Sequence, residues 1–156
     1  MLAHGGAEVL GDPLQGAIAG DVLLPGSPEY ELARKPPIAR FREVRPRAVV
    51  RCATPSDVAA TISMASGAGL RIAPRSGGHC FAGSSSTTGI VVDITPMRSV
   101  SVEGGVVTVG AGARLGDLYD ALAAHDLTIP AGCGPPSGSP GSPSAAGWGS
   151  SAAATG

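Results

Sequence analysis

The stretch AVVRCATPSDVAATISMASGAGLRIAP, residues 48–74, decides the fold class. Its apolar start at Ala48–Cys52 predicts a strand, and its end at Arg71–Pro74 predicts a second, shorter strand. The residues between them, Asp57–Leu70, predict a helix, because hydroxyl side chains and a proline stand before it and glycines stand near its end. Together the three elements predict a compact βαβ unit.

Six further elements are predicted around this unit. The pair Gly104-Gly105 separates two short apolar runs and is typical of a hairpin turn, because glycine adopts positive φ freely. The predicted elements are a short helix at Leu14–Ala19, strands at Ile90–Ile94, Val100–Glu103, Val106–Val109 and Leu127–Ile129, and a helix with apolar residues at helical spacing at Leu115–His125. We therefore expect an α+β fold, with a βαβ subdomain followed by an incomplete second, β-rich subdomain.

The composition excludes several classes of function. The net charge is −1 and aromatic residues make up 3% of the chain, so neither a basic face nor stacking rings are available for nucleic acid. No apolar run reaches the roughly 18 residues of a membrane span, and the start does not have the pattern of a signal peptide. The 3 cysteines are too scattered for a disulfide framework or a zinc site. We expect a cytoplasmic protein without metal, membrane or nucleic-acid partner.

Three segments of the chain differ in composition. Residues 1–43 carry Gly or Pro every few positions, which predicts a loop-rich lead-in. Residues 44–135 hold nearly all of the predicted strands and helices and form the predicted domain. Residues 136–156 consist almost wholly of Pro, Ser, Gly and Ala, without Leu, Ile, Val or charge. Such a tail cannot bury enough apolar surface to offset chain entropy, which predicts disorder.

The sequence RSGGH at residues 75–79 is the candidate binding site, in a polar loop that follows a predicted strand. Adjacent glycines let successive backbone N–H groups point into one concavity, and such a nest binds phosphate oxygens. Ser76 would add a hydroxyl donor and Arg75 a charge. The neutral imidazole of His79 is a nucleophile that can bond to an electrophilic cofactor carbon. On these five residues alone, a glycine-rich surface turn with an incidental histidine is an alternative of equal weight.

Seven segments, in order along the chain, carry a resemblance to a known family. They are VLLPG at 22–26, EY at 29–30, PRAVV at 46–50, SDVA at 56–59, RSGGHCFAG at 75–83, VGAGA at 109–113 and IPAG at 129–132. From Val22 to Pro135 the chain resembles the FAD-linked oxidases of the berberine-bridge-enzyme type, which have a PCMH-type FAD-binding domain of the vanillyl-alcohol-oxidase fold. One match of this length would be weak evidence, whereas the ordered set is specific.

The resemblance implies an FAD cofactor. In that family the RSGGH loop wraps the FAD pyrophosphate and its histidine bonds to the 8α carbon of the isoalloxazine, which implies this role for His79. The flavin supplies the redox chemistry, and the protein supplies placement and electrostatics. The cofactor-binding residues implied are Arg75, Ser76, Gly77, Gly78, His79, Phe81, Ala82, Gly83, Gly110, Gly132 and Cys133.

The function implied is that of a flavoprotein oxidase. Such an enzyme oxidises an alcohol, sugar or amine-like carbon of a small-molecule substrate and passes the electrons to O₂. The substrate domain and the catalytic residues would lie beyond this chain, so none is assigned within it and the chain is interpreted as a truncated, inactive portion. Two alternatives stay open. One is a non-catalytic remnant, and the other is a nucleotide-binding module that uses Gly110–Gly116, whose glycine spacing departs from the dinucleotide-binding fingerprint.

Two departures from the family pattern concern the end of the chain. Many members attach the flavin a second time through a cysteine in a Gly-x-Cys-Pro context. Here residues 132–135 read GCGP, with Cys133 one position early, so we expect a single covalent link. Beyond Pro135 the family continues with a glycine-rich run that contacts the flavin. GC-rich codons for such a run, read one base late, yield residues 136–156, so we interpret the tail as a frameshift product whose gene should encode that run in another frame.

Overall fold

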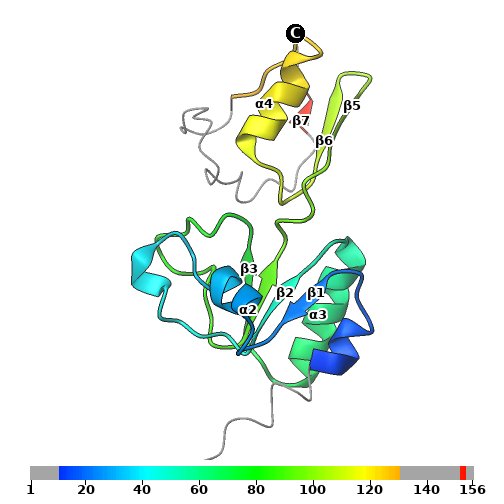
Figure 1. The fold of residues 1–156 in the computed structure, drawn as a ribbon. Coiled ribbons are helices and arrows are strands. Elements are labelled where there is room, and N and C mark those ends of the chain that lie inside the picture. Colours follow the sequence, from blue (N-terminus) through cyan, green and yellow to red (C-terminus); the bar gives the residue numbers. More distant parts are fainter. Residues whose placement is uncertain (1–10, 131–151, 154–156) are drawn as a thin grey trace, which may run out of the picture. The chain divides into compact units, whose positions relative to one another are not determined.

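The computed structural model describes residues 11–130 and 152–153, and the chain divides into two compact units, Met1–Pro96 and Met97–Gly156 (Figure 1). The first unit contains β1 (Asp21–Leu23), α2 (Pro28–Ala33), the 3₁₀ turn η1 (Ala39–Phe41), β2 (Ala48–Arg51), α3 (Pro55–Gly67), β3 (Ile72–Arg75) and β4 (Ile90–Asp93). The second contains β5 (Val100–Glu103), β6 (Val106–Val109), α4 (Leu115–Ala123) and β7 (Ala152–Ala153). Both units contain helices as well as strands, which agrees with the predicted α+β class.

The first unit is built on a four-stranded sheet in the order β1-β2-β4-β3. Strands β2 and β3 both pair with β4 in parallel, and β1 pairs with β2 antiparallel. The βαβ unit predicted as compact is therefore split, because β4 lies between the two strands that α3 connects. The reason is burial. All four residues of β4 are buried, which only a central strand allows, whereas exposed and buried residues alternate along β3, as suits an edge.

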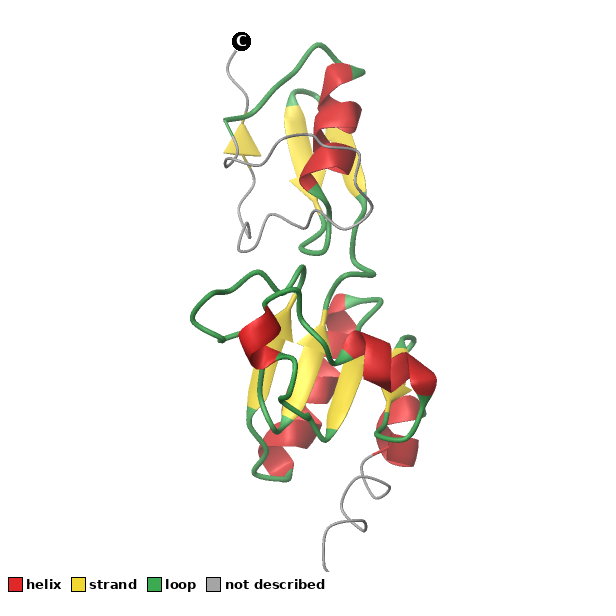
Figure 2. Cartoon of the chain, turned by 60° about the vertical axis from the view of Figure 1, so that its left-hand side comes forward, coloured by secondary structure: helices red, strands yellow, loops and turns green. Residues whose placement is uncertain are grey.

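Helices cover both faces of this sheet (Figure 2). On one face Ala65 of α3 packs with Val50 and Ile90. On the other face Tyr30 of α2 packs with Val49 and Val91 and is fully buried. The alternation of side chains along each strand thus sends successive valines of β2 into two different cores.

The start of α3 is held by a capping box. Thr54 is the N-cap and accepts a hydrogen bond from the Asp57 N–H, while the Asp57 carboxylate accepts from the Thr54 N–H. Asp57 Oδ1 and Oδ2 also accept from the N–H groups of Ala19 and Gly20, at 3.1 Å each. This single carboxylate therefore ties the helix to the turn that leads into β1, a long-range role that a local cap motif does not reveal.

The loop-rich lead-in predicted for residues 1–43 is more ordered than expected. It supplies β1, α2 and η1. The six-residue helix α2 forms because Ser27 caps it, with its Oγ accepting from the Tyr30 N–H, and because Pro28 stands at its first turn. A helix of six residues is too short to show periodicity, and burial of Tyr30 stabilises it instead. The Tyr30 hydroxyl donates to the Pro46 carbonyl at 2.5 Å.

The short helix predicted at Leu14–Ala19 lies earlier in the chain than expected. Residues 11–15 are helical. The helix ends there because the N–H groups of Gly16 and Ala17 donate to Asp12 and Leu14 and close the last turn. The Leu14 side chain is buried in the same core as α3.

The second unit contains the predicted hairpin with its predicted bounds, since β5 and β6 pair antiparallel and Gly104 and Gly105 both adopt positive φ. Its core consists of Val107 of β6 with Leu118 and Leu122 of α4. The two residues of β7 pair with β6 on its other edge. The register of β5 with β6 is thus fixed by the turn that the sequence predicts.

Two predictions for this unit were wrong in detail. Helix α4 ends at Ala123 rather than His125, because Asp126 takes positive φ (55°) and the Leu127 N–H turns back to the Leu122 carbonyl at 3.0 Å. The strand predicted at Leu127–Ile129 does not form, and this segment instead packs its apolar side chains against the core of the unit. No helix among residues 11–130 and 152–153 is both long enough and apolar enough to cross a bilayer.

Candidate functional site

The loop of residues 76–89, between β3 and β4, contains the candidate site. Its first anchor is Arg75, which is 6% exposed and ends β3. The Arg75 Nε donates to the Ser85 carbonyl at 2.9 Å, across the loop. Its Nη1 donates to the carbonyls of Ala33 and Arg34 at the end of α2, at 2.8 and 3.2 Å. The side chain predicted to bring charge to a phosphate is thus bonded to backbone carbonyls.

Two glycines of this loop stand where only glycine fits. Gly78 is buried with φ +73°, and a Cβ there would lie 3.1 Å from Pro37 Cδ. Gly83 has φ +82°, and a Cβ there would lie 2.5 Å from Cε1 of the Phe41 ring. The loop therefore lies directly on the segment of residues 36–41, with its backbone in the left-handed region at both contacts.

Two hydroxyl groups in the loop are buried and have no hydrogen-bond partner within the described part of the chain. They are Ser76 Oγ and Ser86 Oγ. A buried polar atom without a partner is rare in folded proteins and requires an explanation, of which a bound group is one. Ser76 was predicted from the sequence. Ser86 was not, because it stands in a run of three serines, residues 84–86, that offers no way to choose among them.

Three of the remaining predicted residues of the loop face solvent. His79, Phe81 and Ala82 are exposed, and the Phe81 side chain is 79% exposed, whereas Gly77 is partly buried. Hydrogen bonds from the backbone and the hydroxyl of Ser84 lower the pKa of the Cys80 thiol. An exposed imidazole is accessible for bonding to a group bound against the loop.

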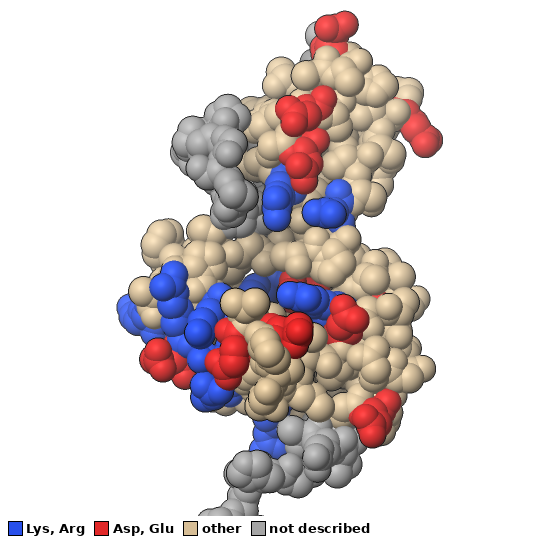
Figure 3. Space-filling model, in the orientation of Figure 1, with Lys and Arg blue, Asp and Glu red and all other residues tan. Residues whose placement is uncertain are grey.

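The arginine-rich segment of residues 34–47 belongs to the same unit, and Figure 3 shows Lys and Arg gathered there together with Asp and Glu. Arg34 is 5% exposed and bonds to Glu31 and to the Arg42 carbonyl. The other arginines of the segment, Arg40, Arg42, Arg45 and Arg47, are exposed. Arg42 donates to the carbonyls of residues 36–37. The guanidinium groups of Arg34 and Arg42 thus hold residues 36–42 through hydrogen bonds to their carbonyls, and the loop of residues 76–89 packs on this segment.

Three predicted residues lie outside this loop. Gly110 belongs to the second unit, where a Cβ would clash with the Met97 carbonyl and where its N–H donates to Ser99 at 2.8 Å. Close packing of backbone therefore accounts for this glycine. Gly132 and Cys133 lie outside the described residues, so their predicted contact with a cofactor remains a prediction.

Comparison with known proteins assigns the family. Residues 46–156 match the family described as FAD binding domain. The chain belongs to this family. The FAD-linked oxidoreductase pynB of Aspergillus niger is 35% identical over 128 residues, which cover 78% of this chain and 24% of that protein. The aclacinomycin-N/aclacinomycin-A oxidase of Streptomyces galilaeus is 42% identical over 101 residues, which cover 62% of this chain and 18% of that protein.

Solved structures agree with this assignment. The 6-hydroxy-D-nicotine oxidase from Arthrobacter nicotinovorans superposes with a TM-score of 0.66 at 32% identity, over 69% of this chain and 24% of that one. Wild-type BBE-like 1 of Physcomitrella patens superposes with a TM-score of 0.68 at 34% identity, over 79% of this chain and 28% of that one. The FAD-binding chain is thus a berberine-bridge-enzyme-like member of a family of FAD-dependent oxidoreductases, and FAD is its cofactor.

The FAD-binding chain spans between 18% and 28% of the length of the four proteins compared above. The family match runs through residues 136–156, so the low-complexity tail lies within the matched range. The origin of that tail in a frameshift stays a prediction. The expected disorder of the tail concerns residues that lie largely outside the described part of the chain.

The side chains of this loop have the chemistry needed to bind the pyrophosphate of FAD. Ser76 and Ser86 offer buried hydroxyl groups that have no hydrogen-bond partner in residues 11–130, and phosphate oxygens accept such donors. The positive φ of Gly78 turns the backbone between them. These residues would hold the phosphates, with His79 available beside them.

Proposed function

We propose that this chain is the FAD-binding portion of an oxidase that binds its flavin covalently through His79. The observation that supports the proposal is the loop of residues 76–89, in which two buried hydroxyl groups lack hydrogen-bond partners among the described residues while the imidazole of His79 is exposed. The predicted cofactor-binding residues Arg75 to Gly83 all belong to this loop or flank it. For Gly132 and Cys133, which lie outside the described residues, contact with the cofactor stays a prediction.

Attachment at His79 would balance as an oxidation. The imidazole would lose its N–H proton and form a C–N bond in place of one C–H bond of the flavin 8α methyl group. The two electrons and two protons released would pass to O₂ and give H₂O₂. A bound flavin supplies the acceptor for two electrons from the substrate. The protein holds the phosphates, presents the imidazole and prevents loss of the cofactor.

The substrate class proposed is an alcohol, a sugar or an amine-like carbon of a small molecule, with O₂ as acceptor. The relatives support this breadth by their names, which include an aclacinomycin oxidase and an (R)-6-hydroxynicotine oxidase. The chain covers 26% of the second of these proteins, so residues that would choose the substrate are proposed to belong to the rest of such an enzyme. We therefore propose that the 156-residue chain by itself does not oxidise a substrate.

The test measures whether flavin stays attached to the chain after denaturation. The purified chain, incubated with FAD in air, is precipitated with acid, and the fluorescence of the pellet is measured. We expect fluorescence from the wild-type chain and none from His79→Ala. The matched control is His125→Ala, which removes an exposed histidine of the second unit and should leave the signal unchanged. A wild-type pellet without fluorescence, or equal fluorescence in His79→Ala, contradicts the proposal, and the first result favours a non-catalytic remnant.

A further inference from the structure

Two neighbouring residues of η1, Arg40 and Phe41, contact the loop of residues 76–89. The Arg40 Nη2 donates a hydrogen bond to the Phe81 carbonyl at 3.2 Å. The Arg40 Cζ also lies 4.7 Å from the centroid of the Phe41 ring, which is the distance of a cation–π contact. One exposed guanidinium group therefore links the backbone of the loop to the aromatic ring beside it.

The Phe41 ring lies against Gly83 in the middle of the loop. A Cβ at position 83 would lie 2.5 Å from Cε1 of this ring, so the ring occupies the space that a side chain would need. Gly83 also joins two backbone turns, because its N–H donates to the Cys80 carbonyl at 3.1 Å and its carbonyl accepts from the Ser86 N–H at 2.9 Å. Contact at Gly83 thus holds both turns of the loop.

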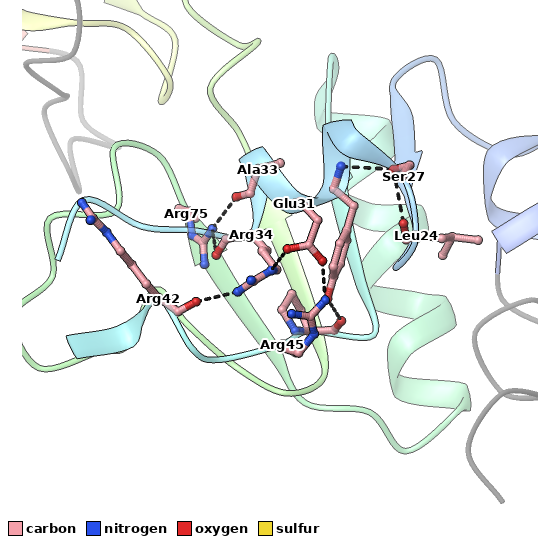
Figure 4. Close-up of polar contacts among 10 residues, drawn as sticks. Leu24, Ser27, Glu31, Ala33, Arg34, Arg42, Arg45 and Arg75 are labelled. Atoms are coloured by element: carbon pink, nitrogen blue, oxygen red, sulfur yellow. Dashed lines mark hydrogen bonds and ion pairs between the residues drawn. The ribbon is translucent and has the colours of Figure 1, made fainter. Parts of the chain in front are cut away.

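The segment that carries Arg40 and Phe41 is itself held by hydrogen bonds. Arg42 donates to the carbonyls of residues 36–37 on the other side of η1. The Arg42 carbonyl accepts from the buried side chain of Arg34 (Figure 4). The two residues therefore contact the loop from a segment whose backbone is fixed before and after η1.

Little else stabilises this part of the loop. His79, Phe81, Ala82 and Ser84 are exposed, so few apolar contacts hold residues 79–84 in place. A segment of this kind opens at a small cost in free energy. Loss of one contact then lowers the fraction of chains in which the loop is closed, and a ligand that binds only the closed loop loses affinity in proportion to that fraction.

We infer that Arg40 and Phe41 form a clamp that holds residues 81–83 and gives the loop its flavin-binding shape before the cofactor is bound. Both are positioning residues, because they act through the backbone of the loop. The clamp belongs to the lead-in, outside the range of residues 46–156 that matches the family. Its effect on flavin rests on the proposed function at His79, whereas its effect on the loop does not.

The first measurement is hydrogen–deuterium exchange of the FAD-free chain, on peptides that cover residues 80–89 and, as a control for folding, residues 90–96. Phe41→Leu removes the ring and Arg40→Ala removes the guanidinium group, and each should raise exchange in the loop about tenfold. Phe41→Tyr keeps the ring, and Arg40→Lys keeps a cation and a donor, so both should exchange as wild type does. The matched control is Arg47→Ala, at an exposed arginine of the same segment, which should also match wild type.

The second measurement is the rate at which acid-stable flavin forms at increasing FAD concentration. In Arg40→Ala and Phe41→Leu the half-saturating FAD concentration should rise at least about threefold, while the limiting rate stays unchanged, because bound cofactor restores the closed loop. Arg40→Lys and Phe41→Tyr should keep the wild-type value. A general loss of folded protein would instead lower the final amount of attached flavin at an unchanged half-saturating concentration.

Unchanged loop exchange in either Arg40→Ala or Phe41→Leu, in a variant whose β4 exchanges at the wild-type rate, overturns the inference. An unchanged half-saturating FAD concentration, or an equal effect of Arg47→Ala, also overturns it. If Phe41→Leu does not fold, Arg40→Ala decides alone, since that side chain is exposed and its removal leaves the core intact. A wild-type chain that attaches no flavin, with faster loop exchange in the variants, contradicts the proposed function instead and leaves the clamp supported.

Discussion

Asp57→Asn tests whether one buried carboxylate holds the sheet, helix α3 and the lead-in of the first unit together. The Asp57 side chain is 3% exposed. Its Oδ1 accepts from the Ala19 N–H at 3.1 Å and from the Thr54 hydroxyl at 2.8 Å. Its Oδ2 accepts from the N–H groups of Gly20, Ala53 and Thr54 at 3.1, 2.8 and 3.2 Å. All five donors meet a charged acceptor.

An asparagine can replace only one of the two oxygens. If its oxygen takes the place of Oδ2, three N–H groups keep an acceptor, but the NH₂ group then faces the Ala19 N–H. An unpartnered buried donor costs about 1–3 kcal/mol. The other hydrogen bonds lose the charged acceptor that made them roughly twice as strong as neutral ones. We therefore expect Asp57→Asn to lower the free energy of unfolding by about 2–4 kcal/mol.

The assay is urea unfolding followed by far-ultraviolet circular dichroism at neutral pH. With a slope of about 2 kcal/mol per molar urea, the midpoint should fall by about 1–2 M. The control is Asp21→Asn, which removes an exposed carboxylate of β1 in the same unit and should shift the midpoint by less than about 0.3 M.

The pH dependence of the stability difference between wild type and Asp57→Asn can refute this reasoning. Burial opposes the charge on Asp57, but the hydrogen bonds that it accepts outweigh burial and lower its pKa. A carboxyl with a lowered pKa in the folded state contributes stability above its unfolded pKa, and this contribution is lost as the pH falls through the folded value. The difference between wild type and Asp57→Asn should therefore shrink below about pH 4. A difference that stays constant from neutral pH to about pH 2 would refute the reasoning.

Two further predictions concern the flavin loop. Gly83→Ala should lower the free energy of unfolding by at least about 2 kcal/mol more than Gly26→Ala does. Both positions have positive φ, but only a Cβ at position 83 would also meet the ring of Phe41. Equal losses of stability in urea unfolding would contradict this contact. Ser86→Ala should weaken FAD binding about tenfold in a fluorescence titration, since a charge-assisted hydrogen bond contributes roughly 1.5–3 kcal/mol. The control Ser63→Ala, at an exposed position of α3, should bind as wild type does, and unchanged affinity in Ser86→Ala would remove that hydroxyl from the site.

Local sequence signals predicted those parts of the fold whose cause is local. The hairpin around Gly104-Gly105 has its predicted bounds, because glycines at the turn fix the register of the strands. Helix α3 begins near its predicted start because a hydroxyl N-cap and a proline act within one turn. The short helix α2 and the strand β1 were missed, because both depend on burial against distant residues rather than on their own periodicity.

Some features of the candidate site were likewise predicted from local sequence, whereas others appeared only in the structure. The sequence located the loop, because adjacent glycines next to a serine and a histidine form a pattern within five residues. It assigned Arg75 to the cofactor, which stays a prediction, but it did not indicate that this side chain bonds to α2 and to Ser85. The sequence also gave no reason to select Ser86. Burial of its hydroxyl depends on how the whole loop folds.

The order of residues alone determined the family and the cofactor, and it selected the loop of residues 76–89 as the candidate site, because each follows from short motifs whose chemistry is local. Only the tertiary structure decided that β4 separates β2 from β3, and that the lead-in forms the surface on which the loop lies. The physical reason is that burial and backbone hydrogen bonding are satisfied between segments far apart in the chain. Which strand becomes central, and which carbonyl an arginine reaches, is settled only when those segments meet.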